Sequence, residues 1–146
     1  MLPGTSARPG DVTIRRWMNG KDGAFDVTVT GPLSPSNVAE AAAQAGAALE
    51  KACMRKVRET SEACQQEGIV FLPFALETLG GLHKGATTQV KLIATALARN
   101  KGLYEGEATS QLFGRISLTL MKANALMLST RCQDADFPPP LIDGIE

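Results

Sequence analysis

Histidine, cysteine and aromatic side chains are scarce in this sequence of 146 residues. It has one histidine and three cysteines, and no two cysteines form a CxxC pair, so the ligand spacing of an ordinary zinc site is missing. Three cysteines cannot all pair, and we expect reduced, structural thiols in an intracellular protein of the nucleus or cytoplasm. Aromatic residues make up only 5% of the chain, which leaves little stacking surface for single-stranded nucleic acid.

Long apolar runs are also missing. The longest, IVFLPFAL at residues 69–76, is too short to span a bilayer, and the first ten residues lack the apolar region of a signal peptide, so we expect no membrane partner.

The composition is typical of one globular domain, which we assign to residues 1–132, followed by an acidic, proline-rich tail at 133–146. Without the four acids of the tail, the body has 15 bases against 11 acids, a balance compatible with DNA as a partner.

A β-hairpin is predicted near the start of the sequence. Residues 24–30, AFDVTVT, alternate apolar and polar side chains with the period of a strand that has one apolar face. Residues 11–17, DVTIRRW, form the second strand, and Asn19-Gly20 between them is a strong signal for a hairpin turn. With this turn at the tip, residues whose numbers add to 39 face each other, whereas a second turn signal at Asp22-Gly23 allows other registers.

Two carboxylates come out on one face of this hairpin. In the first register Asp11 lies opposite Thr28 and Asp26 lies opposite Thr13. The two aspartates are then diagonal neighbours that can reach one ion. Aspartate is depleted in strand interiors because its side chain competes for backbone hydrogen bonds. Its presence in a run of β-branched residues therefore suggests a specific role.

A long crossover helix is predicted next. Ser36 or Asn37 can cap a helix that runs to about Gln66 and ends at Gly68. Its apolar stripe recurs at intervals of three and four residues and consists of Val38, Ala42, Ala45, Leu49 and Cys53. Lys56 continues this stripe about five turns after its first residue, so we expect it to face the sheet.

The remainder completes a small α/β (α+β) domain. Residues 69–76 are predicted to form a strand buried on both faces, with Pro73 marking a bulge or a place near the sheet edge. Helices are expected over residues 87–99 and 107–131, the last burying an apolar stripe of Leu112, Ile116, Leu120, Ala123 and Met127. The fold is thus a small mixed sheet with a hairpin, a crossover helix, a buried strand and two C-terminal helices.

Asp11, Asp26 and Lys56 form the constellation that could carry chemistry. Two carboxylates on adjacent strands suit Mg²⁺, which keeps several waters and leaves room for a substrate phosphate. A lysine beside them could orient a metal-activated hydroxide or offset charge on a phosphorane. The ordinary alternative is a cross-strand pair between Asp26 and Arg15. In that case Asp11 only begins a strand and Lys56 extends to solvent.

Two motifs carry a family resemblance. ARPGDV at residues 7–12, followed by a turn and AFDVTVTGPL at 24–33, resembles the PD…(D/E)xK signature of restriction-endonuclease-like nucleases. The sequence is most similar to the nuclease segment of retroelement reverse-transcriptase polyproteins, where a lysine-bearing helix and an apolar strand ending in glycine follow. IVFLPFALETLGGL at 69–82 looks like that strand, so the likeness covers residues 7 to about 85.

The resemblance implies a metal-dependent endonuclease that hydrolyses DNA with Mg²⁺ or Mn²⁺. It implies Asp11 and Asp26 as catalytic metal ligands, with the Val27 carbonyl as a third. One glycine separates the proline and aspartate of the PD pair, and Thr28 stands where the signature has lysine. In the retroelement branch that lysine moves to the following helix, which makes Lys56 the catalytic candidate here.

A second function stays open, that of a catalytically inactive remnant acting as a protein–protein or dimerisation module. The family has a helix and a strand before the PD strand, and this sequence begins after them, as a fragment or decayed copy of a larger protein would. Such a sheet has an exposed edge through which a homodimer can form. A third interpretation, a small-ligand domain, rests on ETLGGL alone, which matches neither a dinucleotide fingerprint nor a P-loop.

Several polar residues have ordinary explanations. We expect His83 to be a solvated loop residue, although it could touch phosphate. Glu77, at the end of the apolar strand, could be a third acidic ligand but is expected at the surface. A basic cluster on the long helix could follow a nucleic-acid backbone, yet neighbouring glutamates favour a solvated face; it consists of Lys51, Arg55, Lys56 and Arg58.

Overall fold

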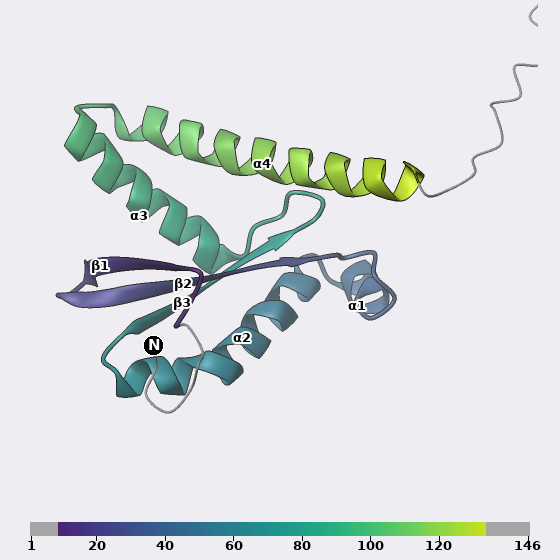
Figure 1. The fold of residues 1–146 in the computed structure, drawn as a ribbon, viewed down its shortest axis with the longest axis horizontal. Helices are drawn as coiled ribbons and strands as arrows, with labels where there is room; N and C mark the ends of the chain where they lie inside the picture. The colour runs from purple at the N-terminus through teal and green to yellow at the C-terminus, as the bar shows by residue number, and fades with distance from the viewer. Residues whose placement is uncertain (1–8, 134–146) are drawn as a thin grey trace, which may run out of the picture.

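The computed structural model describes residues 9–133, which form a three-stranded sheet and four helices (Figure 1). The strands are β1 (Val12–Met18), β2 (Lys21–Thr30) and β3 (Val70–Glu77). The helices are α1 (Val38–Ala43), α2 (Ala47–Gln66), α3 (Lys84–Lys101) and α4 (Glu105–Gln133). The small mixed sheet of an α+β domain is confirmed, and the predicted tail beyond residue 133 lies outside the described residues.

The hairpin of β1 and β2 turns at Asn19-Gly20, as predicted. Both residues have positive φ, 51° and 77°, which is the backbone of a type I′ turn and matches the twist of the flanking strands. A β-bulge interrupts β1 between Ile14 and Met18, before the turn, where Arg16 has a φ of 52°. Its N–H donates to Oδ1 of Asp22 at 2.9 Å, so a carboxylate satisfies the backbone group that the bulge leaves out of the strand pairing.

The predicted register is wrong beyond this bulge. Met18 and Lys21 pair as the turn requires, but the partners farther along are Val12↔Phe25, Thr13↔Ala24 and Ile14↔Gly23. Thr13 therefore lies opposite Ala24 and not opposite Asp26. Because the shift is an even number of residues, each strand keeps the same side chains on the same face of the sheet.

β2 is the central strand of the sheet. It pairs antiparallel with β1 and parallel with β3. Parallel strands need a crossover connection, which α1 and α2 supply. β3 is an edge strand, and an edge tolerates the missing N–H of Pro73, as predicted. The loop after β3 folds back along this edge, where the His83 N–H donates to the Ala75 carbonyl at 3.0 Å.

The predicted long helix is wrong as a single element, because it breaks at residues 44–46. Gln44 is extended, with φ of −145° and ψ of 121°, and Gly46 has a φ of 79° before α2 begins. Only glycine adopts this left-handed conformation without steric cost. The expected stripe is correspondingly shortened, since Leu49 and Cys53 are buried whereas Val38 is 42% exposed.

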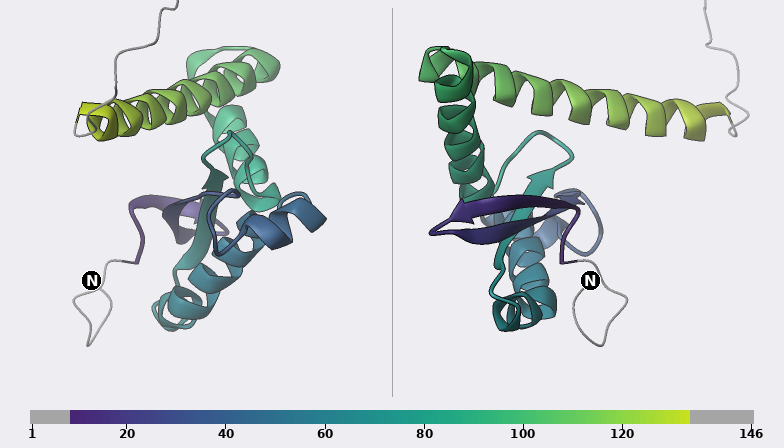
Figure 2. Two further views of the ribbon diagram at one scale, coloured as in Figure 1. Left: turned by 90° about the vertical axis from the view of Figure 1, so that its right-hand side faces the viewer. Right: turned by 60° about the vertical axis from the view of Figure 1, so that its left-hand side comes forward.

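Helices cover the two faces of the sheet unequally. α2 lies along one face, where its Leu49 and Cys53 pack with Ala75 of β3 (Figures 1 and 2). On the other side α3 contacts β3, and α4 returns over α3 with Ala108 packed against two alanines of that helix. Asn124 of α4 also donates to the Thr78 carbonyl at 2.7 Å, which ties α4 to the loop after β3.

This unequal cover corrects two predictions about burial. Within β3 only Ala75 and Leu76 are buried, so the strand is half-buried and not enclosed on both faces. The far half of α4 is mostly exposed, including Met127 of its predicted stripe. The cause is that α3 reaches only part of the second face, and α4 packs on α3 more than on the sheet. No helix within residues 9–133 has the length and hydropathy to cross a membrane.

Gly46→Ala tests the break between α1 and α2. An alanine there must adopt positive φ, so we expect the free energy of unfolding to fall by about 1 kcal/mol, measured by urea denaturation. Gly114→Ala, inside α4 with no neighbouring atom within 4 Å of the new methyl group, is the control. It should raise stability by about 0.5–1 kcal/mol. A stabilising Gly46→Ala would instead mean that one helix runs through residues 44–46.

Candidate functional site

An ion pair joins the central strand to the crossover helix. Asp26 of β2 lies on the face that α2 covers, and Nζ of Lys56 lies 2.8 Å from its Oδ2. Both side chains are largely enclosed, with 17% of Asp26 and 26% of Lys56 exposed. Oδ2 is fully buried, and among residues 9–133 no well-oriented hydrogen-bond donor reaches it, which leaves the ammonium group as its charge partner. The prediction that Lys56 faces the sheet is confirmed, and Arg15 is not the partner of Asp26.

Asp11 stands beside this pair through its own contact with β2. Its N–H donates to the Phe25 carbonyl at 2.8 Å, and its Oδ2 accepts from the Val27 N–H at 2.7 Å. These two bonds place the Asp11 carboxylate next to the residue that follows Asp26. The predicted pairing of Asp11 with Thr28 is wrong, but the structure brings both aspartates to the same stretch of β2.

Gly10 explains the departure from a simple PD motif. A Cβ atom at this position would lie 2.6 Å from the Phe25 carbonyl oxygen, closer than any real contact. Glycine therefore lets the chain lie against β2, so that the next N–H can reach the same carbonyl. The glycine between Pro9 and Asp11 is a requirement of this close approach, which the spacing alone did not predict.

Cys64 on α2 lies near Asp26 and contacts the segment before β1. It is completely buried on α2, and its thiol donates to the Pro9 carbonyl at 3.6 Å, so the helix also contacts the segment before β1. Burial raises the pKa of the Cys64 thiol, and the nearby charge of Asp26 raises it further. Burial likewise raises the pKa of Cys53, with Glu50 adding to the effect. The burial of Cys53 and Cys64 agrees with the prediction that they are structural, whereas that prediction is wrong for Cys132, which is exposed on α4.

His83 has a structural role at the start of α3. Its Nδ1 accepts from the Gly85 N–H at 3.2 Å, which caps the helix and leaves the ring proton on Nε2, 3.0 Å from the Glu50 carboxylate. This bond, and then the charge of Lys84, lower the pKa of Glu50. The prediction of a solvated histidine is wrong, because only 11% of the His83 side chain is exposed. Its partner lies 33 residues away, so no local pattern could show it.

Glu77 does not join the aspartates. It pairs with Thr30 in the parallel register, whereas Asp26 pairs with Pro73, four residues earlier. Four residues of strand separate the two carboxylates by about 13 Å along the sheet. Across residues 9–133, no three His, Cys, Asp or Glu side chains gather as a metal cluster. A cation here would therefore depend on two carboxylates, backbone oxygen and water, which is the kind of coordination that Mg²⁺ accepts.

Comparisons of the chain with protein-family models, with curated proteins and with solved structures gave no match. The family resemblance therefore rests on the motif residues themselves.

A double-mutant cycle tests the coupling of Asp26 with Lys56. Each single variant, Asp26→Asn or Lys56→Met, removes one charge of a mostly enclosed pair, and the cycle should give a coupling of about 1–2 kcal/mol by urea denaturation. Glu40 and Lys51 form the control pair, because their side chains are 58% and 49% exposed. Their coupling should stay near about 0.3 kcal/mol. Equal coupling in the two cycles would contradict an enclosed pair at Asp26.

Proposed function

We propose that this chain is a metal-dependent endonuclease domain that hydrolyses phosphodiester bonds in DNA, on a restriction-endonuclease-like core. One observation carries the proposal, the contact between Lys56 on the crossover helix and Asp26 on the central strand. The signature's lysine position holds Thr28, so a lysine supplied by the helix is what this arrangement requires. The placement of Asp11 against Val27 supports the same site.

The residues present fit a divalent cation. Carboxylate oxygens are the ligands that Mg²⁺ and Mn²⁺ favour, and Asp26 carries a buried oxygen with no neutral hydrogen-bond donor among the described residues. A carboxylate has about four acceptor positions, and the bond from Val27 occupies one of those of Asp11. Asp11, Asp26 and the Val27 carbonyl would hold the ion. When bound, it lowers the pKa of a water and offsets charge on a phosphate.

Lys56 then has a role besides neutralising Asp26. Its ammonium group lies at the same carboxylate, in a largely enclosed setting where charges interact more strongly than in water. There it can stabilise negative charge that develops on the phosphate oxygens during hydrolysis. Lys56 also balances the charge of Asp26 in the free protein, so the site avoids an unpaired buried carboxylate.

Asp11→Asn is the sharpest test of this activity. The amide oxygen can still accept from the Val27 N–H, so we expect the melting temperature to stay near that of the wild type. Loss of the charge should weaken Mn²⁺ binding, measured by calorimetry, and lower nicking of plasmid DNA by about 100-fold or more. Asp26→Asn should do the same at some cost in stability, because it leaves Lys56 without its partner.

Asp22→Asn is the matched control. Its carboxylate lies in the same hairpin and also accepts from a backbone N–H, that of Arg16, but at the bulge and not at the site. It should leave Mn²⁺ binding and nicking unchanged. A wild-type protein that binds no Mn²⁺ and cuts neither plasmid nor oligonucleotide would overturn the proposed activity.

A second candidate function, a dimerisation module of the same fold, is favoured by the uncovered side of the sheet. β1 has no strand on its outer edge within residues 9–133. On the face away from α2, Val12, Val27 and Val29 are 51%, 44% and 51% exposed. Free edges beside apolar side chains are surfaces on which a second copy of a chain can pair.

Sedimentation equilibrium tests this second function. The module should be a dimer, and Val12→Lys should shift it to monomer, because a charge on an edge strand opposes edge-to-edge pairing. Val57→Lys on α2 is the control, since Val57 is 42% exposed and lies away from the edge. A wild-type protein that remains monomeric at every concentration would exclude the dimer.

A further inference from the structure

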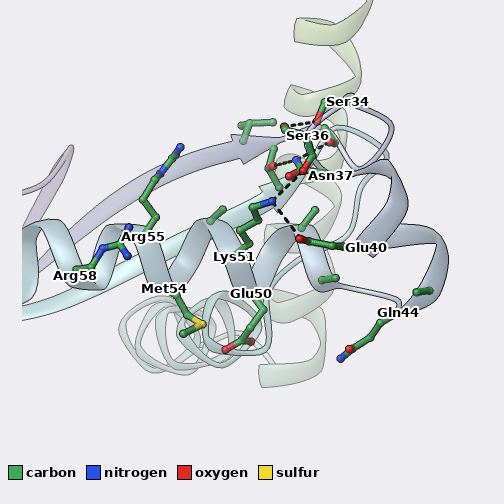
Figure 3. Close-up of a pocket in the computed structure, with 17 residues that line it drawn as sticks. Ser34, Ser36, Asn37, Glu40, Gln44, Glu50, Lys51, Met54, Arg55 and Arg58 are labelled. Carbon is green, nitrogen blue, oxygen red and sulfur yellow. Dashed lines mark hydrogen bonds and ion pairs between the residues drawn. The ribbon is translucent and has the colours of Figure 1, made fainter.

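A groove lies beside the site, on the side of the molecule where α1 and α2 meet the end of β2. It has a volume of about 1230 Å³ and is open to solvent (Figure 3). β2 contributes Val29 and Thr30, and α2 contributes three basic side chains, Lys51, Arg55 and Arg58. The β1 pairing covers β2 only as far as Phe25 in the described residues, so the strand is uncovered where it borders the groove.

The acids of the groove are already partnered. Glu40 lies 3.2 Å from Lys51, and Glu50 accepts from His83 with Lys84 at 3.9 Å. Neither carboxylate therefore needs a further cation.

Arg55 and Arg58 have no carboxylate within 4 Å in the part of the chain that the structure describes. Both are exposed and stand one turn apart on α2, as Figure 3 shows. These two guanidinium groups are the free charges of the groove, and they suit an anionic ligand.

The rest of the lining indicates which kind of anion. Ser34 and Ser36 carry exposed or half-exposed hydroxyls in the loop before α1, toward which Lys51 also reaches (Figure 3). Arginine, lysine and serine side chains are the groups that contact phosphate and sugar in protein–DNA complexes. No aromatic side chain among the described residues lines the groove, so bases have no platform on which to stack.

The groove adjoins the ion pair along both elements that form it. Ala52, which lines the groove, lies one turn before Lys56 on the same face of α2, and Thr30 lies four residues beyond Asp26 on the same face of β2. We propose that this groove binds the phosphodiester backbone of double-stranded DNA, with Arg55 and Arg58 on phosphates that flank the bond held at Asp26 and Lys56. The inference rests on the proposed function. Contacts to phosphate alone carry no sequence information, so binding through these residues does not depend on base sequence.

The test is fluorescence anisotropy with a labelled, mixed-sequence DNA duplex, in EDTA so that binding is measured without cleavage. Arg55→Gln with Arg58→Gln should weaken binding severalfold and lower the slope of log K against log salt by about 2, one unit for each phosphate that no longer has an arginine beside it. Arg55→Lys with Arg58→Lys, which keeps both charges, should retain most of the slope. A second, unrelated duplex should give the same affinities.

Arg99→Gln with Arg115→Gln is the matched control, because it removes the same charge from α3 and α4. It should leave the salt slope unchanged. Melting temperatures of all variants establish that they fold. If the variant with Arg55→Gln and Arg58→Gln keeps the affinity and salt slope of the wild type, DNA does not bind in the groove. That conclusion would hold even if Asp11→Asn abolishes nicking. Arginine-dependent binding by a wild-type protein that cuts nothing would instead support the groove and overturn the proposed hydrolysis.

Discussion

Parallel pairing between β2 and β3 is the constraint on which the rest of the structure depends. The register runs from Gly23↔Val70 to Thr30↔Glu77, so the chain between the two strands must cross over the sheet. The crossover places α2 along one face, where Leu49 and Cys53 pack on Ala75 and Lys56 reaches Asp26. A slip of one residue in this pairing would turn Asp26 to the opposite face, away from its lysine. The register between β2 and β3 therefore determines both the packing of the core and the geometry of the candidate site.

The segment before β1 is held to the same strand from the other side. Gly10 lets the backbone lie against Phe25, the Asp11 carboxylate bonds the Val27 N–H, and the carbonyl of Pro9 receives the thiol of Cys64. These contacts connect β2, the chain before β1 and α2 around Asp26. A site of this kind has its carboxylates positioned by backbone bonds and by packing, which is how a small domain keeps polar groups in a defined geometry.

Sequence reasoning predicted those features that depend on local chemistry or on simple periodicity. Asn19-Gly20 defined the hairpin tip because both residues accept positive φ, and the helical period placed Lys56 toward the sheet. The bulge was missed because Arg16 has no residue preference for the left-handed backbone it adopts, and its carboxylate partner lies six residues away. The break at Gly46 was missed, because a glycine in an alanine-rich run is also compatible with a helix interior, which is where the single predicted helix placed it. The groove depends on that break, and so lay beyond what periodicity could reveal.

The two halves of β2 differ in how they are held, and this gives the sheet a gradient of local stability. Residues 23–25 have strand partners on both sides, whereas residues 28–30 pair only with β3 within the described chain. Backbone amides that lie next to solvent on one side open at lower free energy than those enclosed between two strands. The end of β2 beside the groove can thus open locally while residues 23–25 stay paired with both neighbouring strands. Local stability is therefore greatest just before Asp26 and falls toward the groove.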